Sequence, residues 1–402
     1  MINKTLLIIS NGYPFFNKKD FYSYSFVKVQ VNELKKHFKK VVVICPTPYF
    51  PKTIAKHSSI SYTFKENALR KNYKYDNVEV YFPKYFTLPI TYCRKRNGIY
   101  AYHTTKKTIK KLKLNFDLIH SHFNYISGYV ATELKKDYKI PVVTTIHRNR
   151  ISFLKEYHSN NKNYVSAWKN ADLLIRVNKQ DIKLLKHHNK NTKFIPNCIN
   201  SCDFNIIDKN YTSILPIPKH KKVLLNVANL VVSHKNHINL IKAIKELTTI
   251  RRDFILYLIG EGIDKQLIID KIEELHLGDY IKVLGAKPHN EIPIWMNAAD
   301  LFVFPSYTES FGVVNIEALA CGVPVVSTIN GGSEEIIIND SYGFLLKNPE
   351  DYKGLSVLIN KALNKQWNTN KILDYSKTFS SEIVCNQILN EYNILLGGKN
   401  EL

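Results

Sequence analysis

Apolar and polar positions alternate along the chain in a pattern that predicts strands and helices in turn. Apolar runs short enough for buried strands recur at 5–10, 41–45, 117–122, 141–147, 223–228, 254–260, 280–285, 301–304 and 324–327. Segments with helical spacing separate them, including 24–38, 237–247 and 313–320. Strands that alternate with helices form parallel sheets covered on both faces. The pattern therefore predicts an α/β fold with doubly wound parallel sheets.

The stretch from Asp300 to Val326 has the clearest organisation. Its apolar strand 301–304 is ended by Pro305, and the helix 313–320 is closed by a glycine and followed by Pro324. We expect one of three loop hydroxyls to cap this helix: Ser306, Thr308 or Ser310. The predicted unit is strand, polar loop, helix and strand.

Two carboxylates supply the chemistry of this unit, Glu309 in the loop and Glu317 in the helix. Gly312 between them would let the backbone approach an anion at the helix N-terminus, where free N–H groups and the helix dipole favour negative charge. A bound anion would normally repel carboxylates beside it. Their presence is explained if they accept hydrogen bonds from neutral hydroxyl groups that flank the anion. The plain alternative is a pair of solvated glutamates on a surface helix.

This unit resembles a known donor-binding signature. Glu309 and Glu317 lie in P-S-Y-T-E-S-F-G-V-V-N-I-E-A-L-A-C-G-V-P-V-V, which is followed by Gly331-Gly332, as in the retaining glycosyltransferases of family 4. The resemblance implies the GT-B fold, in which two Rossmann-like domains with doubly wound parallel sheets face a cleft. It implies an acceptor-binding domain at 1–200, a nucleotide-sugar-binding domain at 201–378, and a C-terminal helix at 379–402 that crosses back to the first domain.

The resemblance implies catalytic roles for His147, Lys235 and Glu309. Lys235 matches the lysine of the family's R-x4-K diphosphate clamp, whose arginine position holds Asn229. Glu309 would hold hydroxyls of the donor sugar, and Glu317 those of the ribose. The complete set expected to bind the donor is Gly12, Asn229, Lys235, Gly285, Ser310, Phe311, Gly312, Val313, Val314 and Glu317.

Histidines stand where two strands of the first half end. His147 closes Thr145-Ile-His, which matches part of the family's T-x-H-G-x-D loop beside the donor sugar; Arg148-Asn-Arg150 replace its small and acidic residues. His120 and His122 end the preceding strand, and the sequence leaves open whether they pack, orient other groups or contact a ligand.

The implied reaction moves a hexosyl group from a UDP- or GDP-linked sugar to a saccharide or polyprenyl-linked acceptor, with retained anomeric configuration, in cell-surface polysaccharide biosynthesis. No cofactor beyond this donor is expected. Because the chain contains no Asp-x-Asp, we also expect no metal ligands and activity without a divalent ion.

The basic charge is concentrated in one half of the chain. The net charge is +23, and residues 1–200 hold 37 Lys and Arg against 11 Asp and Glu. The positive electrostatic potential of this half would attract an anionic surface, either a membrane leaflet or a nucleic acid. The alternative is that these residues form an ordinary solvated basic surface without a partner. The segment 46–97, rich in Tyr, Phe and Lys, could be an interfacial patch or an ordinary irregular insertion. The helix near 100–113 has the basic and apolar faces of a membrane-surface helix.

Membrane-spanning and disulfide-rich classes are not favoured. No apolar run approaches the length needed to cross a bilayer, and the six cysteines are scattered without a C-x-x-C pair. We therefore expect a cytoplasmic protein, peripheral on the inner face of the cell membrane.

Two alternative functions remain: a nucleotide-sugar 2-epimerase-like enzyme of the same fold, whose acid and base carboxylates the sequence does not mark, and a basic nucleic-acid-binding protein. The latter lacks a recognisable binding motif and leaves 309–326 unexplained, so no nucleic-acid partner is expected.

Overall fold

The computed structural model describes residues 2–14, 25–49, 67, 69–88, 91–159, 161–218 and 220–397 of the 402-residue chain. These residues divide into two compact units. The first unit holds the described residues up to Pro196 together with those from Val384 onward, and the second holds Asn197–Ile383. Each unit is built around its own parallel sheet.

The sheet of the first unit has eight strands in the order β10-β9-β8-β7-β1-β2-β5-β4. All neighbours are parallel except β4, which pairs antiparallel with β5. The chain goes from β1 to β2 on one side and returns through β7 on the other, so the doubly wound topology switches between β1 and β7. The strands are β1 (Ile2–Ser10), β2 (Phe38–Ile44), β4 (Tyr73–Tyr75), β5 (Val78–Tyr81), β7 (Leu118–His122), β8 (Val142–Ile146), β9 (Leu173–Arg176) and β10 (Thr192–Phe194).

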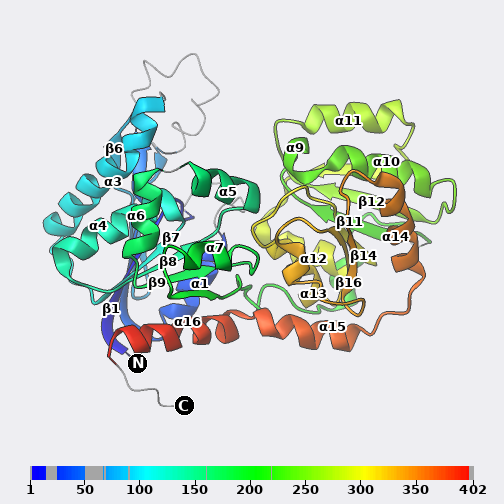
Figure 1. Ribbon diagram of the computed structural model, residues 1–402. Coiled ribbons are helices and arrows are strands. Elements are labelled where there is room, and N and C mark those ends of the chain that lie inside the picture. Colours follow the sequence, from blue (N-terminus) through cyan, green and yellow to red (C-terminus); the bar gives the residue numbers. More distant parts are fainter. Residues whose placement is uncertain are drawn as a thin grey trace. The chain divides into compact units, whose positions relative to one another are not determined.

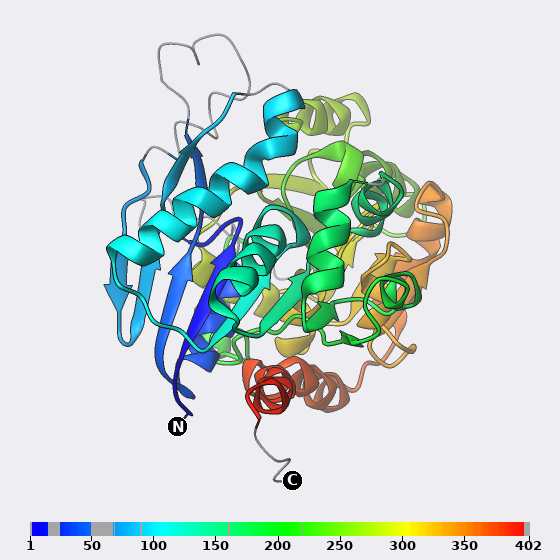
Figure 2. The same ribbon diagram turned by 60° about the vertical axis from the view of Figure 1, so that its left-hand side comes forward.

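Helices cover both faces of this sheet. An apolar core joins one face to α3, α4 and α6, and Figure 2 shows the long helix α3, in cyan, crossing in front of the blue strands. On the other face, α16 packs its buried Tyr392 against Phe38 of β2. The helices are α1 (Ser25–Leu34), α3 (Thr91–Lys111), α4 (Tyr129–Tyr138), α5 (Arg150–His158), α6 (Lys162–Asn170), α7 (Ile182–Lys186) and α16 (Ser381–Leu395), with a π-helical turn at Asn124–Gly128.

The sheet of the second unit has six parallel strands in the order β13-β12-β11-β14-β15-β16. Its topology switches between β11 and β14, so the loops that follow these two strands lie side by side at the position where doubly wound sheets bind ligands. The strands are β11 (Lys222–Val227), β12 (Phe254–Ile259), β13 (Ile281–Gly285), β14 (Leu301–Phe304), β15 (Val325–Thr328) and β16 (Gly343–Leu346).

One core of the second unit lies between its sheet and the helices α10, α11 and α14 (Figure 1). Helix α13 contacts β14 and β15 as well as the neighbouring helices α12 and α15. The helices are α8 (Lys209–Thr212), α9 (Val232–Lys235), α10 (His237–Leu247), α11 (Lys265–Glu274), α12 (Ile292–Asn297), α13 (Val313–Ala320), α14 (Tyr352–Asn364) and α15 (Thr369–Ser376), with 3-10 turns at His289–Glu291, Ser333–Glu335 and Lys377–Phe379.

The segment 46–97, which the sequence predicted to be irregular, contains regular structure in its described part. Strand β5 extends the main sheet beside β2, and β4 adds its edge. Two further strands, β3 (Thr47–Tyr49) and β6 (Lys84–Phe86), pair with each other in a separate parallel ribbon. Strands of three or four residues are too short to show a periodic pattern, which is why the sequence did not reveal them. Residues 50–66, 68, 89 and 90 lie outside the described part.

Every helix among the described residues is either too short or too polar to span a lipid bilayer.

Candidate functional site

The loop that follows β14 holds Glu309 firmly in place. The backbone N–H of Glu309 donates to the carbonyl of Asn330 at 2.9 Å, which ties this loop to the one after β15. The carboxylate Oε1 of Glu309 lies 2.6 Å from the hydroxyl of Ser306 and 2.5 Å from the ammonium of Lys235. An interaction between residues 74 positions apart therefore joins the two loops of the topological switch point.

Lys235 reaches this position because its own loop is fixed at several points. The short helix α9 ends at Lys235, and Asn236 follows in the left-handed conformation with φ 59°. The carbonyl of His234 accepts bonds from the backbone N–H of Tyr307 and the hydroxyl of Ser306, both at 2.9 Å. The ammonium of Lys235 also lies 5.0 Å from the centre of the Phe304 ring. The side chains of Lys235 and Glu309 are 19% and 12% exposed, so the pair is largely shielded from water.

Helix α13 begins at a glycine. Its N-cap residue is Gly312, with φ 86° and no capping hydrogen bond from a side chain. The predicted cap by Ser306, Thr308 or Ser310 is therefore wrong. The left-handed conformation at Gly312 turns the chain directly into the helix. A glycine at the N-cap has no side chain of its own to cover the N–H groups and the positive end of the helix dipole, which attract an anion.

The loops around this helix are packed backbone against backbone. A Cβ added to Gly332 would lie 2.6 Å from the Cα of Phe311, so only glycine allows the approach. Asn330 accepts bonds from the backbone N–H groups of Gly332 and Ser333, at 3.1 and 3.0 Å, and the hydroxyl of Ser333 receives a bond from Asn315 of α13 at 2.9 Å. This network holds the start of α13 against the end of β15.

Glu317 lies one helical turn after Val313 and is 3% exposed. Together with burial, its charge raises the pKa of the Cys321 thiol, one turn further on, to about 12. Because Glu309 and Glu317 are both largely shielded, the alternative of two solvated surface glutamates is wrong. Burying a carboxylate costs folding free energy unless the group is paired or hydrogen-bonded. The shielding of both carboxylates from water therefore favours a functional role over a role on the solvated surface.

Two other expected donor contacts, Asn229 and Gly285, lie at the ends of β11 and β13, the two strands on either side of β12. Asn229 follows β11 and is exposed, and Gly285 ends β13 with φ 72°. The carbonyl of Gly285 accepts the N–H of Gly260 at 2.9 Å. A Cβ on Gly260 would lie 1.8 Å from the carbonyl oxygen of Ala228, so the backbone of the turn after β12 is in direct contact with the backbone of the loop after β11. Sequence reasoning did not include Gly260 in the site, although a G-x-G turn after a strand was a usable signal.

The remaining expected site residues, Gly12 and His147, belong to the first unit. Gly12 is part of a tight turn: its N–H donates to the hydroxyl of Ser10 at 3.3 Å, and that hydroxyl donates to the Gly12 carbonyl at 2.6 Å. The neighbouring Asn11 accepts from the N–H groups of Ile126 and Ser127, at 3.2 and 3.1 Å. The loops after β1 and β7 are thus joined at the topological switch point of this sheet.

His147 belongs to a buried histidine cluster. Its Nε2 lies 3.0 Å from Nδ1 of His122, and the two rings stack at 17° with centres 5.3 Å apart. His120 bonds to the hydroxyls of Thr145, at 2.7 Å, and Tyr392, at 2.5 Å. His120 and His122 are buried, so in this structure they pack and orient their neighbours. Burial lowers the pKa of His122 to about 3 and holds that of His120 well below its usual value.

These depressed pKa values predict an acid-sensitive fold. Between about pH 6 and pH 4 the unfolded chain protonates His122 while the folded chain does not, so the free energy of unfolding falls as the pH is lowered through this window. Each such histidine contributes a slope of about 1.4 kcal/mol per pH unit. Urea unfolding across this range should show a shallower slope for His122→Asn than for the unchanged protein. His103→Asn, at an exposed position, is the matched control, and equal slopes for both variants would contradict the assignment.

A buried arginine, which sequence reasoning missed, fixes the loop after β8. Arg176 is 0% exposed and donates to the carbonyls of Ile146 and Arg148 at 2.9 and 2.7 Å, while its other nitrogen pairs with Asp181 at 2.7 Å. A buried guanidinium needs a counter-charge and hydrogen-bond acceptors, and here both terminal nitrogens have partners while the buried Nε has none among the described residues. The backbone on either side of His147 is therefore held rigidly.

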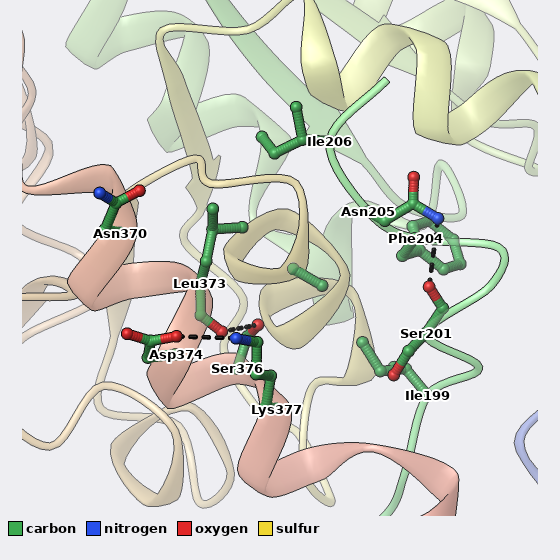
Figure 3. A pocket seen from close by; sticks show the side chains of 11 residues that line it. Ile199, Ser201, Phe204, Asn205, Ile206, Asn370, Leu373, Asp374, Ser376 and Lys377 are labelled. Atoms are coloured by element: carbon green, nitrogen blue, oxygen red, sulfur yellow. Dashed lines mark hydrogen bonds and ion pairs between the residues drawn. The ribbon is translucent and has the colours of Figure 1, made fainter. Parts of the chain in front are cut away.

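A cavity of about 420 Å³ lies elsewhere in the second unit (Figure 3). It is lined by the segment 199–206, by Ala320 at the end of α13, and by residues of α15 and the turn after it. At its rim, Lys377 pairs with Asp374 at 2.8 Å. None of the expected site residues lines this cavity. Eight of the expected residues instead gather at the start of α13 and the facing lysine: Lys235, Glu309, Ser310, Phe311, Gly312, Val313, Val314 and Glu317.

Models of two protein families match the chain. Residues 208–378 match "Glycosyl transferases group 1", and residues 26–201 match "Glycosyltransferase Family 4". An uncharacterised glycosyltransferase of Methanocaldococcus jannaschii is 31% identical over 296 residues, which cover 71% of this chain and 76% of the relative. A putative teichuronic acid biosynthesis glycosyltransferase of Bacillus subtilis, TuaC, is 27% identical over 349 residues, or 85% of each chain.

The crystal structure of HepE from Anabaena in complex with UDP-glucose has a TM-score of 0.70 to this chain at 18% identity, and the match covers 98% of this chain and 100% of HepE. Two doubly wound units with this similarity define a GT-B fold, as the sequence predicted. The chain belongs to the glycosyltransferases of group 1 and family 4.

Proposed function

We propose that this glycosyltransferase moves a hexosyl group from a UDP- or GDP-linked sugar to a saccharide or polyprenyl-linked acceptor, with retained anomeric configuration, in cell-surface polysaccharide biosynthesis. The observation that carries the proposal is the contact between Lys235 and Glu309 beside the start of α13, whose N-cap is a glycine, with Glu317 buried one turn into that helix. HepE, which has the same fold, binds UDP-glucose, and this supports the proposed class of donor. TuaC is named for teichuronic acid biosynthesis, and this supports the proposed class of product.

The charges of this site suit a sugar diphosphate. The diphosphate would lie against the N–H groups of Val313 and Val314, with the ammonium of Lys235 as its counter-charge. Glu309 would then exchange its bond to Lys235 for bonds to hydroxyls of the donor sugar. Glu317 would accept bonds from the ribose hydroxyls. A carboxylate on each side of an anion discriminates against ligands that lack these hydroxyls, because its bonds would be lost.

In the proposed reaction, the bond between the anomeric carbon and the diphosphate oxygen breaks as the acceptor oxygen bonds to the same face of that carbon. The proton of the acceptor hydroxyl passes to a phosphate oxygen of the departing nucleoside diphosphate. Negative charge develops on that leaving group, so Lys235 and the N–H groups of α13 contribute most where the charge grows. His147 is proposed to border the reacting sugar. A separate cofactor is not required for this chemistry.

The proposed reaction proceeds without a divalent metal. The sequence has no Asp-x-Asp, and among the described residues no three His, Cys, Asp or Glu side chains gather closely enough to hold an ion. We further propose a cytoplasmic location, peripheral on the inner face of the membrane, because the first unit contains the basic half of the chain.

A thermal-shift screen with nucleoside diphosphates and their sugars tests the donor site. A ligand that binds only the folded state raises the melting temperature. At a ligand concentration of one hundred times its Kd, the free energy of unfolding increases by about 2.7 kcal/mol. UDP or GDP and the matching sugar are expected to raise the Tm, and the rise should persist in EDTA.

Adenosine and inorganic phosphate serve as controls in this screen, because each supplies only part of the ligand. If no nucleoside diphosphate raises the Tm, the proposed donor site is wrong. If EDTA removes the shift and Mn²⁺ restores it, the site exists but the proposed metal independence is wrong.

A further inference from the structure

Helix α3 uses its apolar face to stabilise the fold. Gly98, Ala101, Thr105 and Ile109 recur at helical spacing and are buried. A Cβ on Gly98 would lie 2.7 Å from the Tyr125 ring, so the helix packs closely against the π-helical turn. The apolar face that suggested a membrane-surface helix is therefore not available for insertion into lipid, and any role of α3 at a membrane must depend on its opposite face.

The opposite face of α3 is a basic stripe. Arg96, His103, Lys107, Lys110 and Lys111 recur at helical spacing and are exposed. The stripe extends about 22 Å along the helix axis. In the described part of the chain, Lys107, Lys110 and Lys111 have no ion-pair partner within 4.0 Å, whereas Lys106 on the flank pairs with Asp137 at 2.8 Å. Within that part of the chain, none of these three lysines is therefore held in an ion pair, although Asp137 attracts Lys110 from beyond ion-pair distance.

The ribbon of β3 and β6 adds exposed aromatic rings beside this helix. Tyr49 is 40% exposed and Phe86 is 55% exposed. The ammonium of Lys84 lies 6.0 Å from the centre of the Tyr49 ring. Both strands contact α3. Exposed rings beside lysines are the composition that settles at the headgroup depth of a bilayer.

The ribbon also has a defined position in the unit. Strand β3 follows the carboxyl end of β2 after two residues, and β6 follows that of β5 after two residues. The ribbon therefore continues beyond the carboxyl edge of the main sheet, the edge at which the loops after β1, β7 and β8 lie. A surface bound by the ribbon would be next to the ligand-binding edge of the first unit.

We propose that Lys107, Lys110 and Lys111 of α3, together with Tyr49, Lys84 and Phe86 of the ribbon, form a docking face for an anionic lipid bilayer. The docked bilayer presents a lipid-linked acceptor to the carboxyl edge of the sheet. This inference rests on the proposed function, because it assigns the acceptor to the amphiphilic class. Charge complementarity favours lipid over a neutral partner, and the exposed rings at one end of the stripe favour a headgroup layer over a nucleic-acid backbone.

Co-sedimentation with vesicles tests this face. The full chain is expected to sediment with vesicles of equal parts phosphatidylglycerol and phosphatidylcholine, to release at high salt, and to stay in solution with phosphatidylcholine alone. The triple variant K107Q/K110Q/K111Q should bind the anionic vesicles about 100-fold more weakly, because each lysine near such a surface contributes about fivefold. Phe86→Ala, which removes an exposed ring, should weaken binding further when combined with it.

The matched control is K282Q/K353Q/K371Q, which removes three exposed lysines from the second unit. It makes the same change in net charge and should bind vesicles like the unchanged protein. If both triple variants weaken binding equally, net charge and not this face attracts the protein, and the proposal is wrong. Equal sedimentation with neutral vesicles would also overturn it, as would single-stranded RNA that binds more tightly than vesicles and depends on the same three lysines.

The thermal shift by nucleoside diphosphates separates this proposal from the proposed function. In K107Q/K110Q/K111Q the shift should be unchanged, because the three lysines lie outside the donor site. Vesicle binding without any nucleotide shift would reject the donor site and leave the docking face standing. A nucleotide shift with no vesicle binding would reject the docking face alone.

Discussion

Replacing Lys235 with methionine is expected to lower the kcat of sugar transfer about 100- to 1,000-fold, the usual effect of removing one group that stabilises a developing negative charge. The ammonium of Lys235 is shielded from water and already attracts one carboxylate, that of Glu309, at 2.5 Å. In the proposed reaction a diphosphate replaces that carboxylate. The measurement is the initial rate of transfer with the donor identified by thermal shift, at saturating donor and acceptor.

Glu309→Gln separates the two partners of this pair. Glutamine has nearly the same shape but cannot compete with a diphosphate as an anion, so the affinity for the nucleoside diphosphate should stay the same or rise. The kcat of transfer should still fall, because the charged acceptor for the donor sugar's hydroxyls is lost. Lys271→Met on α11, where Lys271 pairs with Glu274 at 2.6 Å, is the matched control and should leave the rate unchanged. A Lys235→Met enzyme with the rate of this control would refute the role of Lys235.

Glu317→Ala should strongly reduce the thermal shift produced by nucleoside diphosphates. Glu317 is 3% exposed in α13 and is proposed to accept hydrogen bonds from the ribose hydroxyls. Loss of hydrogen bonds to a charged group costs about 1.5–3 kcal/mol, which corresponds to an increase in Kd of about 10- to 150-fold. Isothermal titration with UDP and GDP measures this directly.

Glu317→Gln distinguishes a binding defect from a folding defect. The amide keeps the volume of the side chain, so the Tm without ligand should stay closer to that of the unchanged protein than the Tm of the alanine variant. The nucleotide shift should still be reduced. Glu274→Gln, at an exposed position of α11, is the control. A Glu317→Ala protein that UDP and GDP stabilise as well as they stabilise this control would remove Glu317 from the donor site.

Much of the fold followed from local patterns. The strand 301–304 and the helices 313–320 and 237–247 have the predicted bounds in the structure. Apolar runs and helical spacing identify such elements because the buried face of a strand or helix is made of apolar residues, which recur with the period of that element. The ribbon of β3 and β6 was missed because three residues carry too little pattern. The described part of 46–97 therefore has more structure than its composition suggested.

The start of α13 shows why the cap prediction failed. Three hydroxyl residues precede this helix in sequence, but the hydroxyl of Ser306 lies 2.6 Å from Glu309 and 2.9 Å from the carbonyl of His234. The left-handed conformation of Gly312 and the backbone contact between Gly332 and Phe311 then set the geometry. A local preference for capping was overridden by contacts with a loop twenty residues further along the chain.

From the sequence alone one could predict the alternation of the longer strands and helices, the uneven distribution of charge, and which carboxylates and glycines could form a donor site, since these depend on residues close together in the chain. Three features emerge only in the folded chain: Lys235 pairs with Glu309, His122 contacts His147, and α3 exposes its lysines while it buries its apolar face. The physical reason is that parallel strands bring distant loops to one edge of a sheet, and the partners there are selected by packing and charge at that edge.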